Sequence, residues 1–480
     1  MTNTSSSNKI NEKVQNLKNQ FKFSQDFLYK THQIQSKTFE FMFFESLVDN
    51  QYLDKNILPK LSIYEDDLIK DRLISLFYAE DVSFKSEEEL SDLLFQGNIL
   101  FLADNCLLSM QMGDFPKRIP EESALETSLR GPRDGFVEDI KTNISLIRRR
   151  IQSSTLCLEK YTIGKRSKTK VALMYMEDII DPRVLKEIQK RLNQVELDIL
   201  VSINELEDCI RDRPKSLVPT LSYTGRPDFL VQALNQGRFA LLVDGNPTVS
   251  FAPIGMLLET KSPEDSYLNY FFVSMERLLR SVGALISVFL PGIWVAFTSY
   301  NIEQIPYLLV ATISVSRLGI PLATGIEMFL ILFLFDLFNE AGARLPRAIG
   351  QSVTVLGGLI IGDAAIRAGL TSPTMLVIVA ITYICSFTVV NPALSTAFSV
   401  LRLIITLLSS IFGLFGTILG FILTIIYFST ITSFGVSYIS SLAPFSFKEG
   451  IKTFLKPPRS FYKSRTTITS PEDATRSGKE

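Results

Sequence analysis

Four charged side chains lie inside otherwise apolar sequence and could do chemistry there. They are Glu327, Asp363, Arg367 and Arg402. A charge within a membrane span is costly and usually faces protein or water, so these residues are candidates for an ion path or for coupling between helices. Asp363 and Arg367 lie four residues apart and can pair on one face of a helix. An ordinary structural ion pair near a helix end explains these two residues equally well.

Small and polar residues form a stripe at helical spacing in the segment that holds Asp363. The stripe comprises Gln351, Thr354, Gly358, Gly362 and Ala365. Small residues allow close helix packing, and this explanation is favoured over a pore lining. If the segment does line a pore in an oligomer, Leu359 or Ile361 beside the stripe could seal the closed state by dewetting. Replacing Ile361 by Ala would then make the closed state leaky, whereas replacing Leu376 on the following span would affect mainly stability.

Catalytic groupings are absent from the sequence. It contains no GxxxxGK[ST] loop, no GxGxxG after a strand, no GxSxG elbow and too few histidines for a Ser-His-Asp arrangement. The four cysteines lie far apart without CxxC spacing, which argues against a disulfide framework or a zinc site. We therefore expect no enzymatic activity, no cofactor, no metal site and no nucleic-acid partner.

The composition divides the chain into two halves, and the four charged residues lie in the second half. Residues 281–447 contain no lysine and only ten acidic or arginine side chains, while residues 1–280 carry charges throughout. A membrane span requires about 20 mainly apolar residues to cross roughly 30 Å of hydrocarbon, and the second half supplies several such runs. The composition predicts an α/β soluble N-terminal domain of two subdomains, followed by an all-α polytopic transmembrane domain.

The soluble half begins with a polar stretch. Residues 1–20 are rich in Ser, Asn, Lys and Gln, which predicts a flexible tail. Residues 21–128 form the first predicted subdomain, in which apolar positions recur at spacings of three and four and favour amphipathic helices. These positions include Phe39, Phe43, Phe44 and Leu47. Residues 97–112 predict a β-hairpin.

The second predicted subdomain covers residues 129–260 and alternates strands with helices. Strands are expected at 171–175, 197–201, 239–243 and 248–252. Helices are expected to end at 147–150, to cover 181–192, and to begin near 204 and 227. Such alternation is typical of an α/β layer. A connecting helix at 261–280 would lead into the membrane half.

Six membrane crossings are expected in residues 281–447. They are 281–300, 319–338, 349–368, 373–390 and the two parts of a long run, 394–438, split near 412–416. The run 305–316 is too short to cross and would be re-entrant or interfacial. Residues 448–480 form a basic tail, and the N-terminus lacks the apolar core of a secretory leader. Both the N-terminal domain and the tail are therefore expected in the cytoplasm.

Several motifs resemble those of a known family. They are ETSLRGPRDGF (126–136), Asn143, Arg148-Arg149-Arg150, Gly164, Arg166-Ser167, Gly237-Arg238, VDGNP (243–247), Glu264-Asp265 with Tyr267, RLPRAIGQ (344–351) and GDAA (362–365). Together they cover nearly the whole chain, and the set resembles the signature of the A subunits of GerA-type spore germinant receptors.

The resemblance implies a multi-pass subunit of the spore inner membrane that helps to sense nutrients and to start ion release, and we expect it to form an oligomeric ion-conducting channel. It implies a transporter-like B subunit and a lipoprotein C subunit as partners, besides membrane lipids and further copies of the chain. Two alternatives stay open. A secondary transporter would also suit broken helices and intramembrane charges, although no inverted repeat is visible. The other is the paralogous germination membrane protein associated with dipicolinate release.

Overall fold

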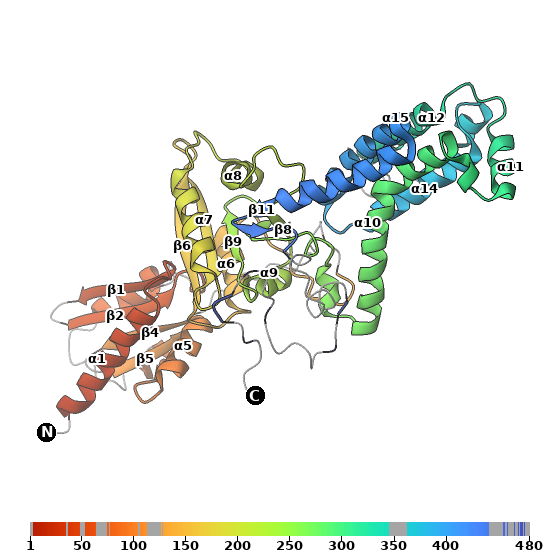
Figure 1. The fold of residues 1–480 in the computed structure, drawn as a ribbon. Helices are drawn as coiled ribbons and strands as arrows, with labels where there is room; N and C mark the ends of the chain where they lie inside the picture. Colours follow the sequence, from red (N-terminus) through yellow and green to blue (C-terminus); the bar gives the residue numbers. More distant parts are fainter. Residues whose placement is uncertain are drawn as a thin grey trace.

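The computed structural model describes most of the chain. The described residues are 3–34, 37–48, 53–63, 74–75, 77–103, 106–112, 126, 128–344 and 362–440, with 455–456, 458, 465, 469, 471–473 and 475 in the tail. Two α/β units and a helical bundle follow one another along the chain and lie in a row (Figure 1). The N-terminal half therefore contains two α/β subdomains and the C-terminal half is mainly helical, as predicted.

The first α/β unit is a five-stranded antiparallel sheet with helices. Its strands lie in the order β1 (Phe27–Ile34), β2 (Lys37–Phe44), β4 (Asn98–Ala103), β5 (Cys106–Gln111) and β3 (Glu80–Asp81). The helical elements are α1 (Asn3–Gln20), η1 (Leu53–Ile57), α3 (Leu58–Ile63) and α5 (Glu87–Phe95). Strands β4 and β5 pair along their whole length, which confirms the predicted hairpin.

The flexible tail predicted at residues 1–20 is wrong for residues 3–20, because these form helix α1. Ile10, Val14 and Leu17 are four and three residues apart, a spacing that places them on one side of a helix. All three are buried in a core of the first unit. Polar residues occupy most of the other positions of α1, and this composition misled the prediction.

The amphipathic helices predicted around Phe39 and Phe44 are also wrong, because both residues lie in strand β2. Side chains along a strand alternate between its two faces. Phe39, Phe41 and Phe43 pack in one core, whereas Met42 and Phe44 pack in another. Since both faces of β2 are covered, its sequence is a nearly continuous apolar run, which periodicity alone cannot distinguish from a helix.

The second α/β unit is also built on a five-stranded antiparallel sheet. Its strands lie in the order β6 (Leu156–Ile163), β7 (Thr169–Met176), β9 (Phe239–Val243), β10 (Val249–Ala252) and β8 (Ser222–Thr224). Its helices are α6 (Ile140–Arg148), α7 (Pro182–Gln194), α8 (Ile203–Ile210) and α9 (Pro227–Leu234). These four helices and strands β7, β9 and β10 agree with the predicted elements within a few residues.

The strand predicted at 197–201 is wrong. This segment is an irregular loop in which Leu200 is buried and Val201 is exposed. Its carbonyl groups accept hydrogen bonds from the backbone N–H groups of Lys165 and Arg166, which lie in the turn between β6 and β7. The loop therefore closes that turn instead of joining the sheet. Strands β6 and β8 were not predicted.

One buried ion pair connects the two α/β units. Arg148, at the end of α6, donates to the Asp26 carboxylate through Nε at 3.1 Å and Nη2 at 2.8 Å. Its Nη1 group donates to the carbonyl oxygen of Leu156 at 2.8 Å, and Nη2 also donates to Ser24 Oγ at 3.2 Å. The guanidinium group lies 4.7 Å from the ring centre of Phe44. Both units thus supply partners to one buried charge.

The third part is a bundle of helices. It contains α10 (Tyr270–Ser299), η3 (Ile302–Gln304), α11 (Tyr307–Ser316), α12 (Thr324–Arg344), α14 (Pro373–Ser386) and α15 (Pro392–Thr430). Among the described residues, α10 and α15 are long and apolar enough to cross a membrane. The prediction of a separate connecting helix at 261–280 is wrong. A short 3-10 turn, η2 (Pro263–Ser266), precedes α10, which runs without interruption into the first predicted span.

Helix α15 doubles back at Gly413, where the long apolar run was expected to divide. Gly413 has a φ of 60°, a backbone conformation that side chains other than glycine rarely adopt. Beyond this bend, Thr417 Oγ1 lies 2.8 Å from Ser409 Oγ, and Gly420 packs against Ile405. The two arms of α15 are therefore antiparallel, and Figure 1 shows them side by side in blue.

The chain returns from α15 to the second α/β unit. Two short strands follow the helix, β11 (Thr432–Ser433) and β12 (Val436–Ser437). The hydroxyl of Ser433 donates to the carbonyl oxygen of Thr220 at 2.7 Å and accepts from the N–H group of Ile254 at 3.1 Å. One apolar core extends from the second sheet, at Leu242, into the bundle, at Val288. The second unit and the bundle therefore share a core.

Arg148→Ala should destabilise the protein strongly, because it leaves the Asp26 carboxylate buried without its partner. Breaking a buried pair in this way costs about 3–5 kcal/mol. We expect the midpoint of thermal unfolding, Tm, of the full chain in detergent to fall by several degrees. The matched control is Arg166→Ala, which removes a pair with Asp198 whose side chains are 78% and 58% exposed and should cost under about 1 kcal/mol. Equal Tm values for the two variants would contradict this role of Arg148.

Candidate functional site

Glu327, the first of the predicted intramembrane charges, is completely buried near the start of α12. Its Oε1 atom accepts hydrogen bonds from Thr371 Oγ1 at 3.0 Å and from the N–H and hydroxyl groups of Ser372 at 2.7 and 3.0 Å. Its Oε2 atom lies 3.7 Å from Arg317 Nη2. Since Ser372 is the N-cap of α14, this carboxylate joins α12 to the start of α14.

Arg402 is also buried and belongs to a network that connects three helices. Its Nη2 atom lies 3.0 Å from Asp336 Oδ1 in α12 and 3.3 Å from the hydroxyl oxygen of Tyr383 in α14. The Tyr383 hydroxyl donates to the same Asp336 oxygen at 2.6 Å. Sequence reasoning did not identify these two partners of Arg402, because they lie 66 and 19 positions away along the chain.

The remaining predicted site residues have different surroundings. Asp363 and Arg367 form an ion pair at 2.9 Å, but their side chains are 59% and 78% exposed, which agrees with a local ion pair of successive helical turns. Gly362 is buried against Leu376, whose Cδ2 atom would lie 2.9 Å from an added Cβ. Three stripe residues, Gln351, Thr354 and Gly358, and the neighbouring Ile361 lie outside the described residues.

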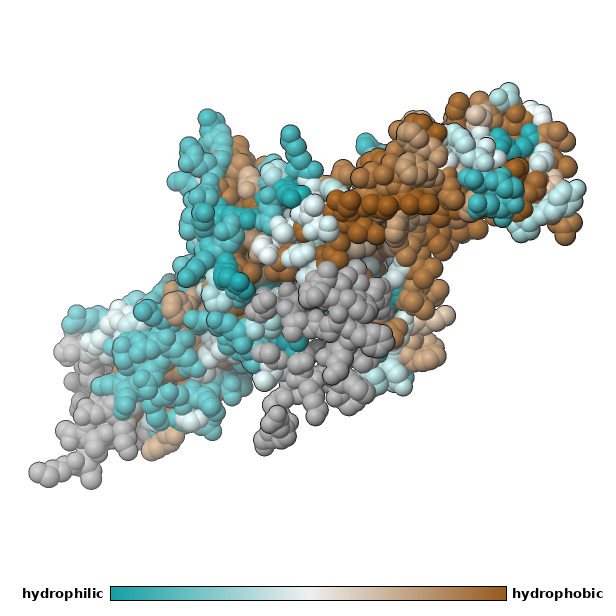
Figure 2. Space-filling view, in the orientation of Figure 1, coloured by the Kyte–Doolittle hydropathy of each residue, from teal (hydrophilic) through white to brown (hydrophobic). Residues whose placement is uncertain are grey.

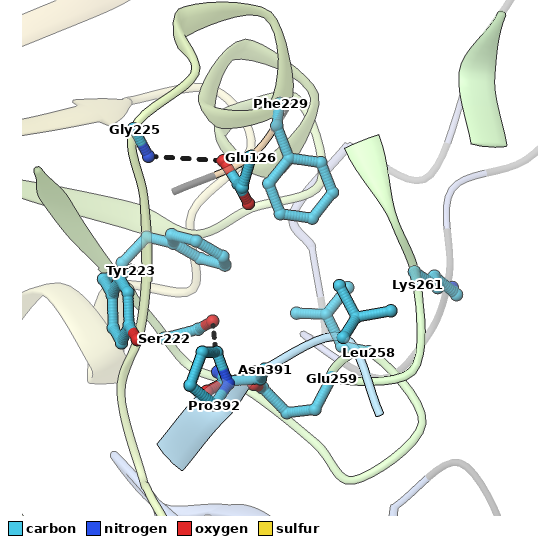
Figure 3. Close-up of a pocket in the computed structure, with 12 residues that line it drawn as sticks. Glu126, Ser222, Tyr223, Gly225, Phe229, Leu258, Glu259, Lys261, Asn391 and Pro392 are labelled. Carbon is cyan, nitrogen blue, oxygen red and sulfur yellow. Dashed lines mark hydrogen bonds between the residues drawn. The ribbon is translucent and has the colours of Figure 1, made fainter. Parts of the chain in front are cut away.

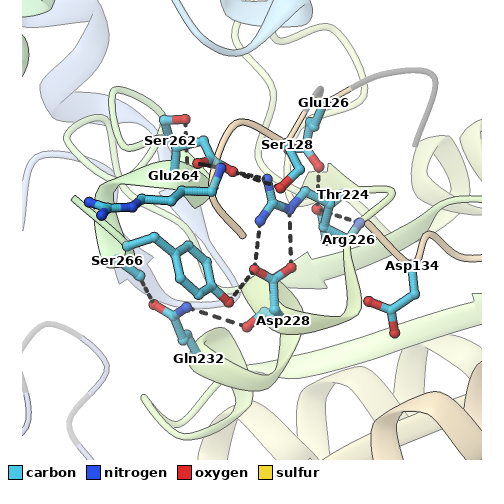
Figure 4. Close-up of polar contacts among 12 residues, drawn as sticks. Glu126, Ser128, Asp134, Thr224, Arg226, Asp228, Gln232, Ser262, Glu264 and Ser266 are labelled. Carbon is cyan, nitrogen blue, oxygen red and sulfur yellow. Dashed lines mark hydrogen bonds and ion pairs between the residues drawn. The ribbon is translucent and has the colours of Figure 1, made fainter. Parts of the chain in front are cut away.

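A second cluster of buried charges lies between the second α/β unit and the bundle, and Arg226 is at its centre (Figure 4). Its Nε and Nη2 atoms donate to the Asp228 carboxylate at 3.1 and 2.8 Å, and its Nη1 atom donates to Glu264 Oε1 at 2.5 Å. The Tyr267 hydroxyl also donates to Asp228, at 2.8 Å. Arg226 and Asp228 were not predicted, because nothing near them in sequence indicates a partner 38 residues away.

The motif at 126–136 completes the contacts of Glu264. Ser128 Oγ donates to its Oε1 atom at 3.2 Å, and the N–H group of Arg130 donates to its Oε2 atom at 3.1 Å. Burial alone would raise the pKa of Glu264, but these bonds and the neighbouring guanidinium group lower it overall. Gly131 is required here, because a Cβ atom would collide with the same guanidinium group. Residues of two separate motifs thus meet at one carboxylate.

The next residue, Asp265, is directed toward the bundle. Its Oδ2 atom accepts from Arg277 Nε at 2.7 Å, and its Oδ1 atom accepts from Arg280 Nη1 at 2.9 Å. Both arginines belong to the N-terminal half of α10. Turn η2 therefore binds the second α/β unit through Glu264 and the first apolar helix through Asp265. Such an arrangement is suited to transmitting a displacement from one part of the chain to the other.

A third carboxylate, Glu259, connects the second unit to α15 (Figure 3). It is buried and accepts a hydrogen bond from Asn391 Nδ2. Asn391 in turn caps α15, because its Oδ1 atom accepts from the N–H group of Ala393 at 2.8 Å. Both residues line a cavity of about 50 Å³ with apolar walls that include Phe229 and Phe251. Burial raises the pKa of Glu259 to about 7.

Metal binding has no support in the part of the chain that the structure describes, since no group of three His, Cys, Asp or Glu side chains there could hold an ion. The described residues form two α/β units, joined by buried ion pairs to a bundle of apolar helices. The family described as Bacillus/Clostridium GerA spore germination protein matches residues 15–468. The chain belongs to this GerA family.

Known relatives agree with this assignment. The chain is 39% identical to spore germination protein XA of Bacillus anthracis, over 82% of this chain and 80% of that protein. It is 36% identical to spore germination protein KA of Bacillus subtilis (strain 168), over 92% and 82% of the two chains. The resemblance to germinant-receptor A subunits is thus confirmed, and the chain is not an enzyme.

One solved structure is also similar to this chain. It is the crystal structure of the N-terminal domain of the A subunit of the Bacillus megaterium spore germinant receptor GerK3. The two are 27% identical, with a TM-score of 0.36, and the match covers 50% of this chain and 92% of that chain.

Glu259 should make stability depend on pH. Its pKa in the folded protein, about 7, lies above its ordinary value of 4.5, so the folded state binds the proton more tightly. The resulting contribution to the free energy of unfolding is complete below about pH 4.5 and is lost as the pH rises through 7. The loss amounts to roughly 3 kcal/mol. Glu259→Gln should remove this dependence, so that its Tm exceeds that of the parent at pH 8 and matches it at pH 5.

The measurement is thermal unfolding of the full chain in detergent between pH 5 and 8. The control variant, Glu276→Gln, changes a half-exposed carboxylate of α10 and should keep the pH profile of the parent. If the Tm of Glu259→Gln varied with pH as that of the parent does, the carboxylate of Glu259 would not be the source of this pH dependence.

Proposed function

We propose that this chain is a membrane subunit of a spore germinant receptor, in which the two α/β units form a soluble unit and the bundle spans the membrane. The chain would pass the response of the receptor to a nutrient from this soluble unit to the membrane helices and so trigger germination. Turn η2 is the observation that carries the proposal. Glu264 binds the second α/β unit, and the next residue, Asp265, binds α10. A displacement of the soluble unit would therefore be transmitted to α10 through two consecutive residues. The names of the relatives, which are spore germination proteins, support the biological setting.

The apolar runs and the basic tail of the sequence are the basis for proposing six crossings, with the soluble unit and the tail both in the cytoplasm. Contacts at the two ends of the bundle agree with antiparallel passes of α10 and the first arm of α15. At the end near the soluble unit, Gly283 of α10 lies against Thr388, which follows α14. At the opposite end, Tyr300 lies against Gly413 in the bend of α15. Helices α10, α12 and α14 and the two arms of α15 would supply five crossings. The crossing predicted at 349–368 would supply the sixth.

An oligomeric ion channel is the mechanism that we propose for this membrane part. Glu327 and Arg402 support it, because buried and paired charges within apolar helices usually mark functional positions. The proposed pore or gate comprises Gln351, Thr354, Gly358, Ile361 and Gly362. In this proposal the subunit works in the spore inner membrane with a transporter-like B subunit, a lipoprotein C subunit and further copies of itself.

Asp265→Asn should uncouple the soluble unit from α10. The substitution removes the charge that pairs with both Arg277 and Arg280, while the carboxamide keeps the size of the side chain. In spores that carry the complete receptor, we expect nutrient-triggered germination to slow by about tenfold or more, the range of a coupling energy of 1–3 kcal/mol. Germination and the amount of the protein in the spore membrane are measured together.

Glu276→Gln is the matched control for this experiment. Glu276 also pairs with Arg280, at 3.0 Å, but its side chain is 43% exposed, so its loss should leave germination unchanged. Normal germination of Asp265→Asn spores would refute the coupling role. Loss of the protein from the spore membrane would assign Asp265 a purely structural role.

A further inference from the structure

The N-terminal half of α10 exposes a continuous apolar face. Its exposed residues are Phe271, Phe272, Met275, Leu278, Leu279 and Val282. They recur at spacings of one, three and four, which places them along one side of the helix. Figure 2 shows that the hydrophobic surface of the bundle continues downward over this part of the molecule. Soluble proteins rarely leave such a face in contact with water.

The opposite side of the same helical segment is already occupied. Arg277 and Arg280 bind Asp265, and the hydroxyl of Ser274 exchanges hydrogen bonds with the backbone of Lys456 at 3.0 and 3.3 Å. These contacts determine the rotation of the helix about its axis. The apolar face is therefore the side that is directed away from the soluble unit.

The length of α10 exceeds what one crossing requires. Its 30 residues extend about 45 Å at 1.5 Å per residue, compared with roughly 30 Å of hydrocarbon. Gly283 lies against Thr388, between the end of α14 and the start of α15, and so marks the end of the bundle nearest the soluble unit. Residues 270–282 continue for about 20 Å past it, at an angle to the arms of α15 (Figure 1).

We propose that residues 270–282 lie along the membrane surface, with their apolar face in the headgroup–acyl boundary of the leaflet next to the soluble unit. Three observations favour lipid as the occupant. The face is continuous with the apolar surface of the bundle, and Tyr270 at its end is an aromatic residue of the kind enriched at membrane interfaces. Lys456, which binds the polar side, belongs to a stretch, 448–465, with six lysine or arginine residues and one acid, and basic segments favour anionic headgroups.

An amphipathic segment of this kind binds membranes through its buried apolar area together with attraction to anionic lipids. It would hold Arg277, Arg280 and turn η2 at a constant height above the bilayer. This inference rests on the proposed membrane function, because it requires that the rest of α10 crosses the bilayer. A test must therefore report on both halves of the helix separately.

The single tryptophan of the chain makes such a test possible. Trp294 lies in the C-terminal half of α10. In the full chain, reconstituted into phosphatidylglycerol vesicles, Trp294 emission should be quenched by lipids brominated in the middle of the acyl chain. Failure of this quenching would refute the proposed crossing itself, independently of the surface segment.

The surface segment is tested with Phe272→Trp in a Trp294→Phe background. Bromines close to the headgroup should reduce its emission at least about twofold more than bromines in the middle of the chain, since interfacial helices lie only about 5–10 Å deep. The control is Phe84→Trp in the same background. Phe84 is 89% exposed in the first α/β unit, so lipid bromines should not quench it.

Two results would overturn the inference. Quenching of Phe272→Trp by aqueous iodide but not by brominated lipid would show that the segment extends into water. Protection from both quenchers would show that protein covers this face, either a second copy of the chain or another subunit. Phe271→Trp repeats the measurement if Phe272→Trp does not fold.

Discussion

Two consecutive buried carboxylates, Glu264 and Asp265, determine how the second α/β unit and the helical bundle are joined. A buried charge without a partner is strongly destabilising, so each must keep the arginines that it contacts. Glu264 is paired with Arg226 in the second α/β unit, and Asp265 with Arg277 and Arg280 in α10. Because turn η2 has only four residues, it cannot move with one partner and leave the other in place. The orientation of α10 follows from this constraint.

Apolar contacts also hold the second α/β unit against the bundle, independently of the ion pairs. One core includes residues of the second sheet, of α10 and of both arms of α15. Asn391 links the start of α15 to Glu259, and Ser433, just after α15, binds Thr220 and Ile254. The second unit therefore holds the first helix of the bundle and both ends of the last one. A movement of this unit relative to the bundle would act on α10 and α15 together, and through the Arg402 network on α12 and α14.

Patterns among neighbouring residues predicted the elements whose structure depends mainly on those residues. Strand β9 is a short apolar run between turns, and the bend at Gly413 divides a run about twice as long as one crossing requires. Strand β2 was predicted as helix because cores on both of its faces remove the alternation that identifies a strand. The charge partners could not be predicted, because Asp26 and Arg148 lie 122 positions apart, and Asp336 and Arg402 lie 66 apart. Motif resemblance indicated Glu264 and Asp265, but not the arginines that give each its role.

The distance between the soluble unit and α10 tests the central claim most directly. Spin labels at Lys186→Cys, on the exposed side of α7, and at Leu285→Cys, on the exposed side of α10, would be introduced after replacement of the four native cysteines. Double electron–electron resonance on the full chain in lipid nanodiscs should give one narrow distance distribution, and Asp265→Asn should broaden it. A distribution that is already broad in the parent, or that Asp265→Asn leaves unchanged, would contradict the claim that turn η2 couples the two parts.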